Sequence, residues 1–66
     1  MQLESNLRAI LTQRGVKQSW LAARVGVRQG TISDLVNNKT VPSLLLALAI
    51  ADVLEVKVEE IWKILR

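Results

Sequence analysis

The stretch that decides the fold is QSWLAARVGVRQGTISDL, which occupies residues 18–35. Its apolar positions recur at intervals of three and four residues, which is the spacing of amphipathic helices rather than strands. Ala22 is small enough to lie where two helices cross, and Gly26 suits the tight turn between them. Ile32 and Leu35 follow as the apolar face of a second helix. The stretch therefore predicts two short helices that pack at a steep angle.

The same spacing extends over most of the chain, and no segment alternates convincingly as a strand does. Gly15 and Asn38 stand where helices end in the left-handed conformation, and Val16 is placed to pack back after Gly15. Pro42 ends one segment, and Ser43 is a good N-cap for the next. The pattern predicts helices at about residues 2–14, 18–25, 29–37, 43–54 and 58–65. We therefore expect one all-α domain of five short helices over the whole 66-residue chain.

Composition argues against catalysis and metal binding. The chain contains neither cysteine nor histidine, so it lacks thiolate and imidazole ligands and the usual nucleophiles and proton shuttles. Glu59 and Glu60 are adjacent on a predicted helix and point about 100° apart, so they do not converge on a substrate. We expect no enzyme, no metal, no cofactor and no small-molecule substrate.

Nothing in the sequence predicts export or a membrane span. Residues 1–4 form neither a basic nor an apolar signal region. The longest apolar run, residues 44–51, has eight residues, whereas a bilayer requires about 20. The cations and the apolar stripes are not segregated on one long helix, as a membrane-surface helix requires. The sequence therefore predicts a cytoplasmic protein.

Positive charge is concentrated in the first half of the chain. Residues 1–33 carry five cations and one anion, whereas residues 34–66 carry four cations and five anions. With an isoelectric point near 10.0, this asymmetry indicates a polyanion facing the first half, either nucleic acid or an anionic surface. A solvated basic face is the other interpretation, and charge alone favours neither.

The second helix of the decisive stretch is predicted to expose a polar face. Burying Ile32 and Leu35 turns the opposite side toward solvent. That side carries Arg28, Gln29, Thr31, Ser33, Asp34 and Asn37. Donors and acceptors on one short exposed helix are what reading base edges in the major groove of DNA requires.

Six short motifs fill and flank the decisive stretch. They are QSWLA at 18–22, VGV at 25–27, TIS at 31–33, NNK at 37–39, PSL at 42–44 and VEEIW at 58–62. Their order and spacing over residues 6–62 resemble the phage repressor and Cro type of helix-turn-helix domain, the xenobiotic-response-element family. The resemblance implies a compact five-helix fold, in which a helix-turn-helix unit at about residues 18–37 places its second helix in the major groove.

The resemblance also implies which side chains contact DNA. In this family the glutamine that opens the first helix of the unit bonds a phosphate, and the helix N-terminus adds its amides and its dipole. The expected phosphate-binding residues are Lys17, Gln18, Asn37 and Lys39. The expected base-reading positions are Arg28, Gln29, Gly30, Thr31, Ser33 and Asp34. A local cap formed by Gln18, and a plain turn at Asn37 and Lys39, are the alternatives.

Two of these positions depart from the family pattern. Gly30 stands where relatives often carry a long polar side chain, so it admits a close backbone or a thymine methyl but offers no side-chain hydrogen bond. Asp34 is acidic on a face that points at phosphates, so it either accepts from a cytosine amino group or pairs with Arg28 or Lys39. Gln29 suits adenine, and Arg28 suits guanine or a phosphate.

Lys17 and Arg28 occupy helix starts where relatives more often place serine or threonine. A missing capping side chain typically costs about 1 kcal/mol, and a cation at that position opposes the helix dipole. A bound phosphate relieves both penalties. We therefore expect these two cations to serve DNA binding rather than stability.

The predicted helix at residues 43–54 is apolar on more than one face. The residues expected to face the core are Leu44, Leu48 and Ala51, with Val53 or Leu54. Leu45 and Ala49 lie one turn apart on another face, where relatives usually carry polar residues. This excess of apolar surface predicts either a partner or a fully buried central helix.

Leu45 and Ala49, together with Trp62 and Ile64, predict an exposed apolar patch away from the reading helix. We expect this patch to form a homodimer interface. A two-fold dimer through it is expected to hold the two reading helices about 34 Å apart, which is one turn of DNA. The target would then be a near-palindromic operator in double-stranded DNA.

Trp20 is an aromatic residue on the polar side of the decisive stretch. It is expected to lie over the corner between the first two predicted helices as partial core. Packing against a sugar-phosphate backbone or a neighbouring subunit is the alternative.

Together these features predict a dimeric, sequence-specific DNA-binding protein, a transcriptional repressor that occludes a promoter. An antitoxin or a restriction-modification controller is the alternative within the same class, because such proteins bind DNA in a similar way. A protein-interaction module on the helix-turn-helix scaffold is the alternative from another class, favoured by Gly30, Asp34 and the apolar helix at residues 43–54.

Overall fold

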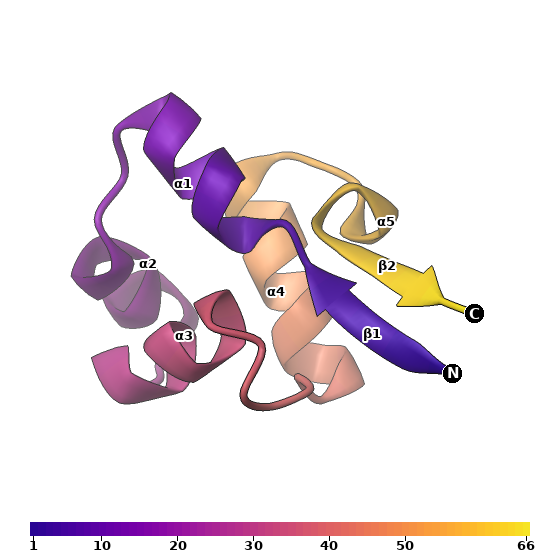
Figure 1. The fold of residues 1–66 in the computed structure, drawn as a ribbon. Coiled ribbons are helices and arrows are strands. Elements are labelled where there is room, and N and C mark those ends of the chain that lie inside the picture. Colours follow the sequence, from indigo (N-terminus) through magenta and orange to yellow (C-terminus); the bar gives the residue numbers. More distant parts are fainter.

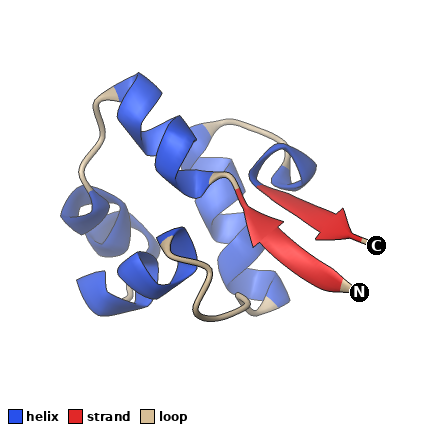
Figure 2. Ribbon diagram, viewed as in Figure 1, coloured by secondary structure: helices blue, strands red, loops and turns tan.

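The computed structural model describes the whole chain, Met1–Arg66. Five helices enclose an apolar core, and two short strands pair at the end of the molecule where both termini lie (Figures 1 and 2). The elements are β1 (Gln2–Ser5), α1 (Leu7–Arg14), α2 (Gln18–Val25), α3 (Gln29–Val36), α4 (Leu44–Leu54), α5 (Val58–Ile61) and β2 (Trp62–Leu65). α2 and α3 lie together at the other end, and α4 runs between that pair and the strands (Figure 1).

Every buried side chain is apolar, and all of them belong to one cluster. Each helix contributes to it, so the core is continuous from α1 to α5. The fully buried large side chains are Leu7, Leu21, Ile32, Leu35, Ile50 and Ile61. Burying a leucine or isoleucine contributes about 1.5–3 kcal/mol, so these six residues account for much of the stability of so short a chain.

The predicted helix ends at glycine and asparagine are confirmed. Gly15 and Gly26 have φ angles of 64° and 76°, in the left-handed region that favours glycine. The backbone N–H of Val16 donates to the Leu11 carbonyl oxygen at 2.9 Å, and that of Val27 donates to the Ala22 carbonyl oxygen at 3.0 Å. These bonds satisfy the last carbonyls of α1 and α2.

Asn38 follows α3 with a φ of 59°, as the sequence predicted. Its side chain also makes a contact that the sequence did not predict, because its Oδ1 accepts a hydrogen bond from the backbone N–H of Ser5 at 2.7 Å. Asn38 therefore fixes the loop after α3 to the end of β1. Asparagine suits this position because it tolerates the left-handed conformation and offers an acceptor.

α4 begins and ends close to the predicted residues, but the sequence did not predict how its C-terminus is capped. Ser43 is its N-cap, and the Ser43 Oγ accepts from the backbone N–H of Leu46 at 3.1 Å. The helix ends at Glu55, a residue other than glycine with a left-handed φ of 57°. The guanidinium of Arg14 donates to the Leu54 carbonyl oxygen, so α1 also satisfies the C-terminus of α4.

The prediction of an all-α fold is wrong at both chain ends. β1 and β2 form an antiparallel ribbon, in which Leu3 lies opposite Ile64 and Ser5 lies opposite Trp62. The helices expected at residues 2–14 and 58–65 are correspondingly shorter. Strands of four residues carry too few apolar positions to show a period, and their pairing joins segments from opposite ends of the chain. No local pattern could reveal this pairing.

The predicted inward face of α4 is also wrong in part. The buried residues of α4 are Ala47, Ile50, Ala51 and Leu54. Leu44 and Leu48, which were expected to face the core, are 75% and 49% exposed. Because the first eight residues of α4 are all apolar, hydrophobic periodicity does not identify one inward face. The small side chains of Ala47 and Ala51 instead allow close packing against the core.

Candidate nucleic-acid interface

The predicted crossing of α2 and α3 is present in the structure. Ala22 on α2 is 3% exposed, and Ile32 and Leu35 on α3 are 0% and 1% exposed. The turn between the two helices runs through Gly26 and ends at Arg28, the N-cap of α3. α3 packs on the core through Ile32 and Leu35, and this leaves its opposite face free of the protein core.

The base-reading positions expected from the sequence lie on or next to that free face. Arg28, Gln29 and Gly30 are exposed, and Thr31, Ser33 and Asp34 are partly buried. A Cβ added to Gly30 would meet no other atom within 4 Å. The centre of this face is therefore open space, which a nucleic-acid groove or a longer side chain can fill.

The N-termini of α2 and α3 lack side-chain caps. Lys17 and Arg28 are the N-cap residues, both have extended backbones, and neither side chain accepts a hydrogen bond from its helix. The first two N–H groups of each helix consequently have no partner of their own, whereas the third N–H of α3 donates from Thr31 to the Arg28 carbonyl oxygen at 3.0 Å. The positive end of each helix dipole lies beside a cation. Such an end favours an anion.

A shallow hollow at the start of α2 brings together residues that the sequence did not connect. Lys17 and Gln18 line it together with Arg8 and Thr12 of α1. Lys17 and Arg8 are exposed, and Gln18 is partly buried. Two cations and a carboxamide therefore line one hollow at the start of α2.

Arg8 also links this hollow to the loop after α3. Its guanidinium donates to the Asn37 Oδ1, although the two residues are 29 positions apart. From the sequence, Arg8 is only one of the cations of the first half, and it is not among the predicted site residues. The only local signal was its position directly after the buried Leu7, which makes it the first exposed cation of α1.

The loop that follows α3 is held by internal hydrogen bonds. The Asn37 Nδ2 donates to the Ser33 Oγ at 3.4 Å, and the Lys39 N–H donates to the Asp34 carbonyl oxygen at 2.9 Å. The side chains of Asn37 and Lys39 are exposed. The predicted phosphate-binding residues of this loop are thus presented beside α3 on a backbone that is already fixed.

Trp20 lies at the corner between α1 and α2, as predicted, but the prediction that it is partial core is wrong, because it does not belong to the core cluster. It lines a small hollow with Gly15, Val16 and Lys17 at the α1–α2 corner, and its side chain is 45% exposed. The guanidinium carbon of Arg24 lies 5.5 Å from the centre of the indole ring. The contact is a cation–π pair on the outer side of α2.

The four residues predicted to form a dimer interface do not share one environment. Leu45 and Ile64 are 80% and 51% exposed, and Ala49 is partly buried. Trp62 is only 8% exposed, because β2 turns it inward as part of the core cluster. Trp62 is therefore a core residue and offers almost no exposed surface to a partner.

The fold and this site together define a helix-turn-helix domain. The chain belongs to the helix-turn-helix family of the Cro/C1 type, whose family model matches residues 7–61. The resemblance that the sequence motifs indicated is thereby confirmed.

Solved structures include a similar fold. A crystal structure described as that of "a putative DNA-binding protein from Bacteroides fragilis" is 26% identical to this chain, with a TM-score of 0.85. The similarity covers 92% of this chain and 98% of that one. No curated protein matches the chain. None of the helices is long and apolar enough to cross a bilayer.

Proposed function

We propose that this protein binds double-stranded DNA in a sequence-specific manner, with α3 in the major groove. The observation that carries the proposal is the exposed polar side of α3, which lies opposite the buried Ile32 and Leu35. A helix about 10–12 Å across fits a groove about 12 Å wide. Membership of the helix-turn-helix family and the similar fold of the Bacteroides fragilis protein support the same function.

Phosphate groups are proposed to bind beside α3, at the start of α2 and along the loop after α3. Lys17, Gln18 and Arg8 line the start of α2. The hydrogen bond from Arg8 to Asn37 joins them to the loop that carries Lys39. Phosphate contacts fix the position of a protein on the duplex without reading sequence. The uncapped N-terminus of α2 adds amide donors and a favourable dipole.

Base reading is proposed to depend on the first turn and the outer face of α3. Gln29 is exposed in the first turn and has the geometry for a bidentate pair with adenine, and Arg28 beside it suits guanine or a phosphate. Gly30 reads no base by a side chain and lets the duplex approach closely. Thr31, Ser33 and Asp34 complete the reading face, where Asp34 accepts from a cytosine amino group.

The biological role that we propose is transcriptional repression by occlusion of a promoter. Two copies of the domain bind a near-palindromic operator, with half-sites about one turn of DNA apart. A role as an antitoxin or a restriction-modification controller involves the same DNA contacts. One observation favours a role in protein interaction instead, namely that Leu44 and Leu45 are 75% and 80% exposed.

In vitro selection from a random duplex library, followed by binding across a salt series, tests the proposal. We expect enrichment of a near-palindrome, with affinity that falls with salt according to the number of phosphates neutralised. Binding that enriches no sequence would overturn sequence-specific recognition. No binding even at low salt would overturn DNA binding altogether and favour the protein-interaction role.

A further inference from the structure

We infer that Trp20 and Arg24, on the outer side of α2, bind the sugar-phosphate backbone of the duplex next to the phosphate proposed for the start of α2. Trp20 packs against a deoxyribose, and Arg24 binds the adjoining phosphate. The inference rests on the proposed function, because its ligand is the same duplex. It adds a contact that neither α3 nor the loop after it makes, and so lengthens the stretch of DNA that one domain covers.

Trp20 is the one aromatic side chain that the fold leaves at the surface. It is 45% exposed, whereas Trp62, the only other aromatic residue, is 8% exposed and belongs to the core. The other exposed large apolar side chains all lie outside α1, α2 and α3. A single exposed apolar residue is ordinary, so the surroundings of Trp20 must show what it serves.

Arg24 is held beside the indole ring and remains open to a ligand. The two residues are four positions apart and therefore neighbours on one side of α2. The guanidinium carbon lies over the ring, 5.5 Å from its centre, and the Arg24 side chain is exposed. The ring limits the positions that the guanidinium can take, while its N–H donors stay available to an anion.

The charge of the surrounding segment favours a polyanion. Residues 5–33, which include α1, α2 and the turn between them, contain five cations and neither aspartate nor glutamate. A partner at Trp20 therefore meets positive charge and no negative charge from this segment. A nucleic-acid backbone combines phosphates with less polar sugars, which suits an aromatic ring between cations.

Trp20 also adjoins the proposed phosphate site at the start of α2. The hollow that Trp20 lines is completed by Gly15, Val16 and Lys17. The same three residues line the hollow that contains Arg8 and Gln18. A DNA strand that reaches Lys17 therefore lies beside Trp20, and a cation, an aromatic ring and a second cation follow one another along α2.

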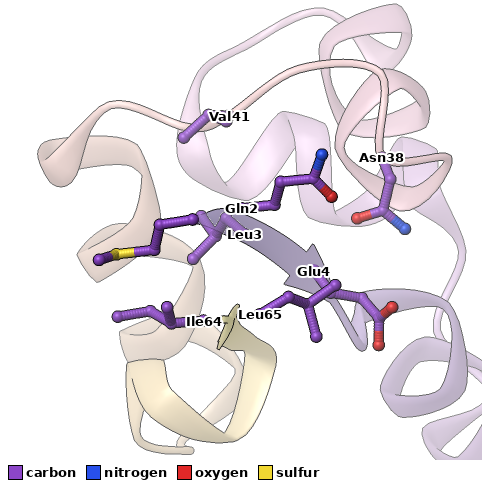
Figure 3. Close-up of a pocket in the computed structure, with 8 residues that line it drawn as sticks. Gln2, Leu3, Glu4, Asn38, Val41, Ile64 and Leu65 are labelled. Atoms are coloured by element: carbon purple, nitrogen blue, oxygen red, sulfur yellow. The ribbon is translucent and has the colours of Figure 1, made fainter.

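The largest hollow of the molecule provides a contrast. It lies at the ribbon end, where β1 and β2 pair, and has a volume of about 710 Å³. Figure 3 shows Leu3, Val41, Ile64 and Leu65 around it, with the carboxylate of Glu4 nearby. Neither lysine nor arginine lines this hollow, so its side chains offer a phosphate no cation. The hollow beside Trp20 includes Lys17 and is therefore the one suited to DNA.

Hydroxyl-radical footprinting on the selected operator tests the inference, because the radical reports which deoxyriboses are covered. We expect the wild type to protect sugars flanking the bases that α3 reads. Trp20→Ala and Arg24→Ala are expected to lose that flanking protection and to keep the protection of the central site. Lys63→Ala is the matched control, since it removes an exposed cation from β2 at the ribbon end.

Affinity for the same operator provides a second measurement. We expect Trp20→Ala and Arg24→Ala each to weaken binding about threefold to tenfold, and Trp20→Phe, which keeps an aromatic ring, to restore most of the loss. Discrimination between the operator and a scrambled duplex is expected to stay unchanged, because a backbone contact reads no base. Each variant is expected to melt cooperatively, since neither side chain belongs to the core.

Tryptophan fluorescence reports the contact directly. Trp62 is buried, so acrylamide quenching of the wild type is expected to come mainly from Trp20 and to fall when the operator is added. Trp20→Phe is expected to show little quenching with or without DNA. Quenching of the bound wild type equal to that of the free protein would overturn the inference.

The outcomes separate this inference from the proposed function. A wild type that binds no duplex would overturn both. A wild type that binds its operator, while Trp20→Ala and Arg24→Ala keep its flanking protection and its affinity, would overturn the inference alone. That result would leave DNA reading by α3 in place and assign the Trp20 surface to an acidic protein partner instead.

Discussion

The helix-turn-helix end and the ribbon end of this molecule present opposite kinds of surface. The exposed face of α3 is polar, and Ile32 and Leu35 on its opposite face are buried in the core. At the ribbon end, Leu44, Leu45 and Ile64 are exposed instead, and the strands come from opposite ends of the chain. The first arrangement follows from local patterns, whereas the second follows from contacts over long sequence distances. The difference separates a surface suited to a polar duplex from one suited to an apolar partner.

The largest expected effect is the contrast between a buried and an exposed leucine. Leu21→Ala in α2 is expected to lower the free energy of unfolding by about 2–5 kcal/mol, because it leaves a cavity in the core. Leu45→Ala in α4 is expected to change it by less than about 0.5 kcal/mol. Urea unfolding at low protein concentration, where the monomer dominates, measures both. Equal losses would show that the apolar side of α4 stabilises the monomer and is no separate surface.

The next effect concerns the loop that joins the two ends. Asn38→Ala is expected to lower the free energy of unfolding by about 1–3 kcal/mol, since alanine is strained at a positive φ and the Ser5 N–H loses its acceptor. Asn38→Gly removes the acceptor, but glycine adopts a positive φ without strain. Its loss in the free energy of unfolding is therefore expected to be smaller. The difference between the two variants isolates the backbone contribution, and identical losses would contradict it.

Two glycines of the helix-turn-helix unit are expected to respond in opposite directions to alanine. Gly26→Ala should destabilise by about 1–2 kcal/mol, because Gly26 has a φ of 76°. Gly30→Ala should stabilise by about 0.5–1 kcal/mol, since Gly30 lies in α3 and an added Cβ meets nothing there. Thermal unfolding of both variants checks the signs. Destabilisation by Gly30→Ala would mean that the open space on α3 is not available to a side chain.

The smallest effect on stability, and a larger one on binding, is expected from Lys17→Ser. Serine can cap α2 and removes a cation from its positive end, so the free energy of unfolding should stay equal or rise by up to about 1 kcal/mol. Affinity for duplex DNA should fall, together with the salt dependence of binding. Unchanged affinity in a filter or fluorescence binding assay would show that Lys17 serves another purpose.

Sequence patterns predicted the helix-turn-helix end closely because its determinants are local. Gly15 and Gly26 each specify a helix end through their own backbone chemistry, and the structure confirms both. The range of α2 also agrees with its prediction, and α3 ends one residue earlier than expected. The exposed face of α3 followed from the helical spacing of Ile32 and Leu35.

The ribbon end was less predictable for physical reasons. Leu3 and Trp62 lie near opposite ends of the chain, so their strands become visible only when the fold brings them together. In α4 the burial of Ala47, rather than of Leu44, depends on how closely neighbouring elements approach. The place of Arg8 beside Asn37 has the same origin, because a contact between α1 and the loop after α3 leaves no local pattern.

The central claim is that α3 reads bases while its surroundings hold phosphates. The most direct test measures the affinity of Gln29→Ala and Arg8→Ala for a selected operator and for a scrambled duplex. Gln29→Ala is expected to lose discrimination, by about 1–3 kcal/mol, and to bind the scrambled duplex as the wild type does. Arg8→Ala is expected to weaken both complexes alike. Equal weakening of both complexes by Gln29→Ala, or no change in either, would contradict base reading by α3.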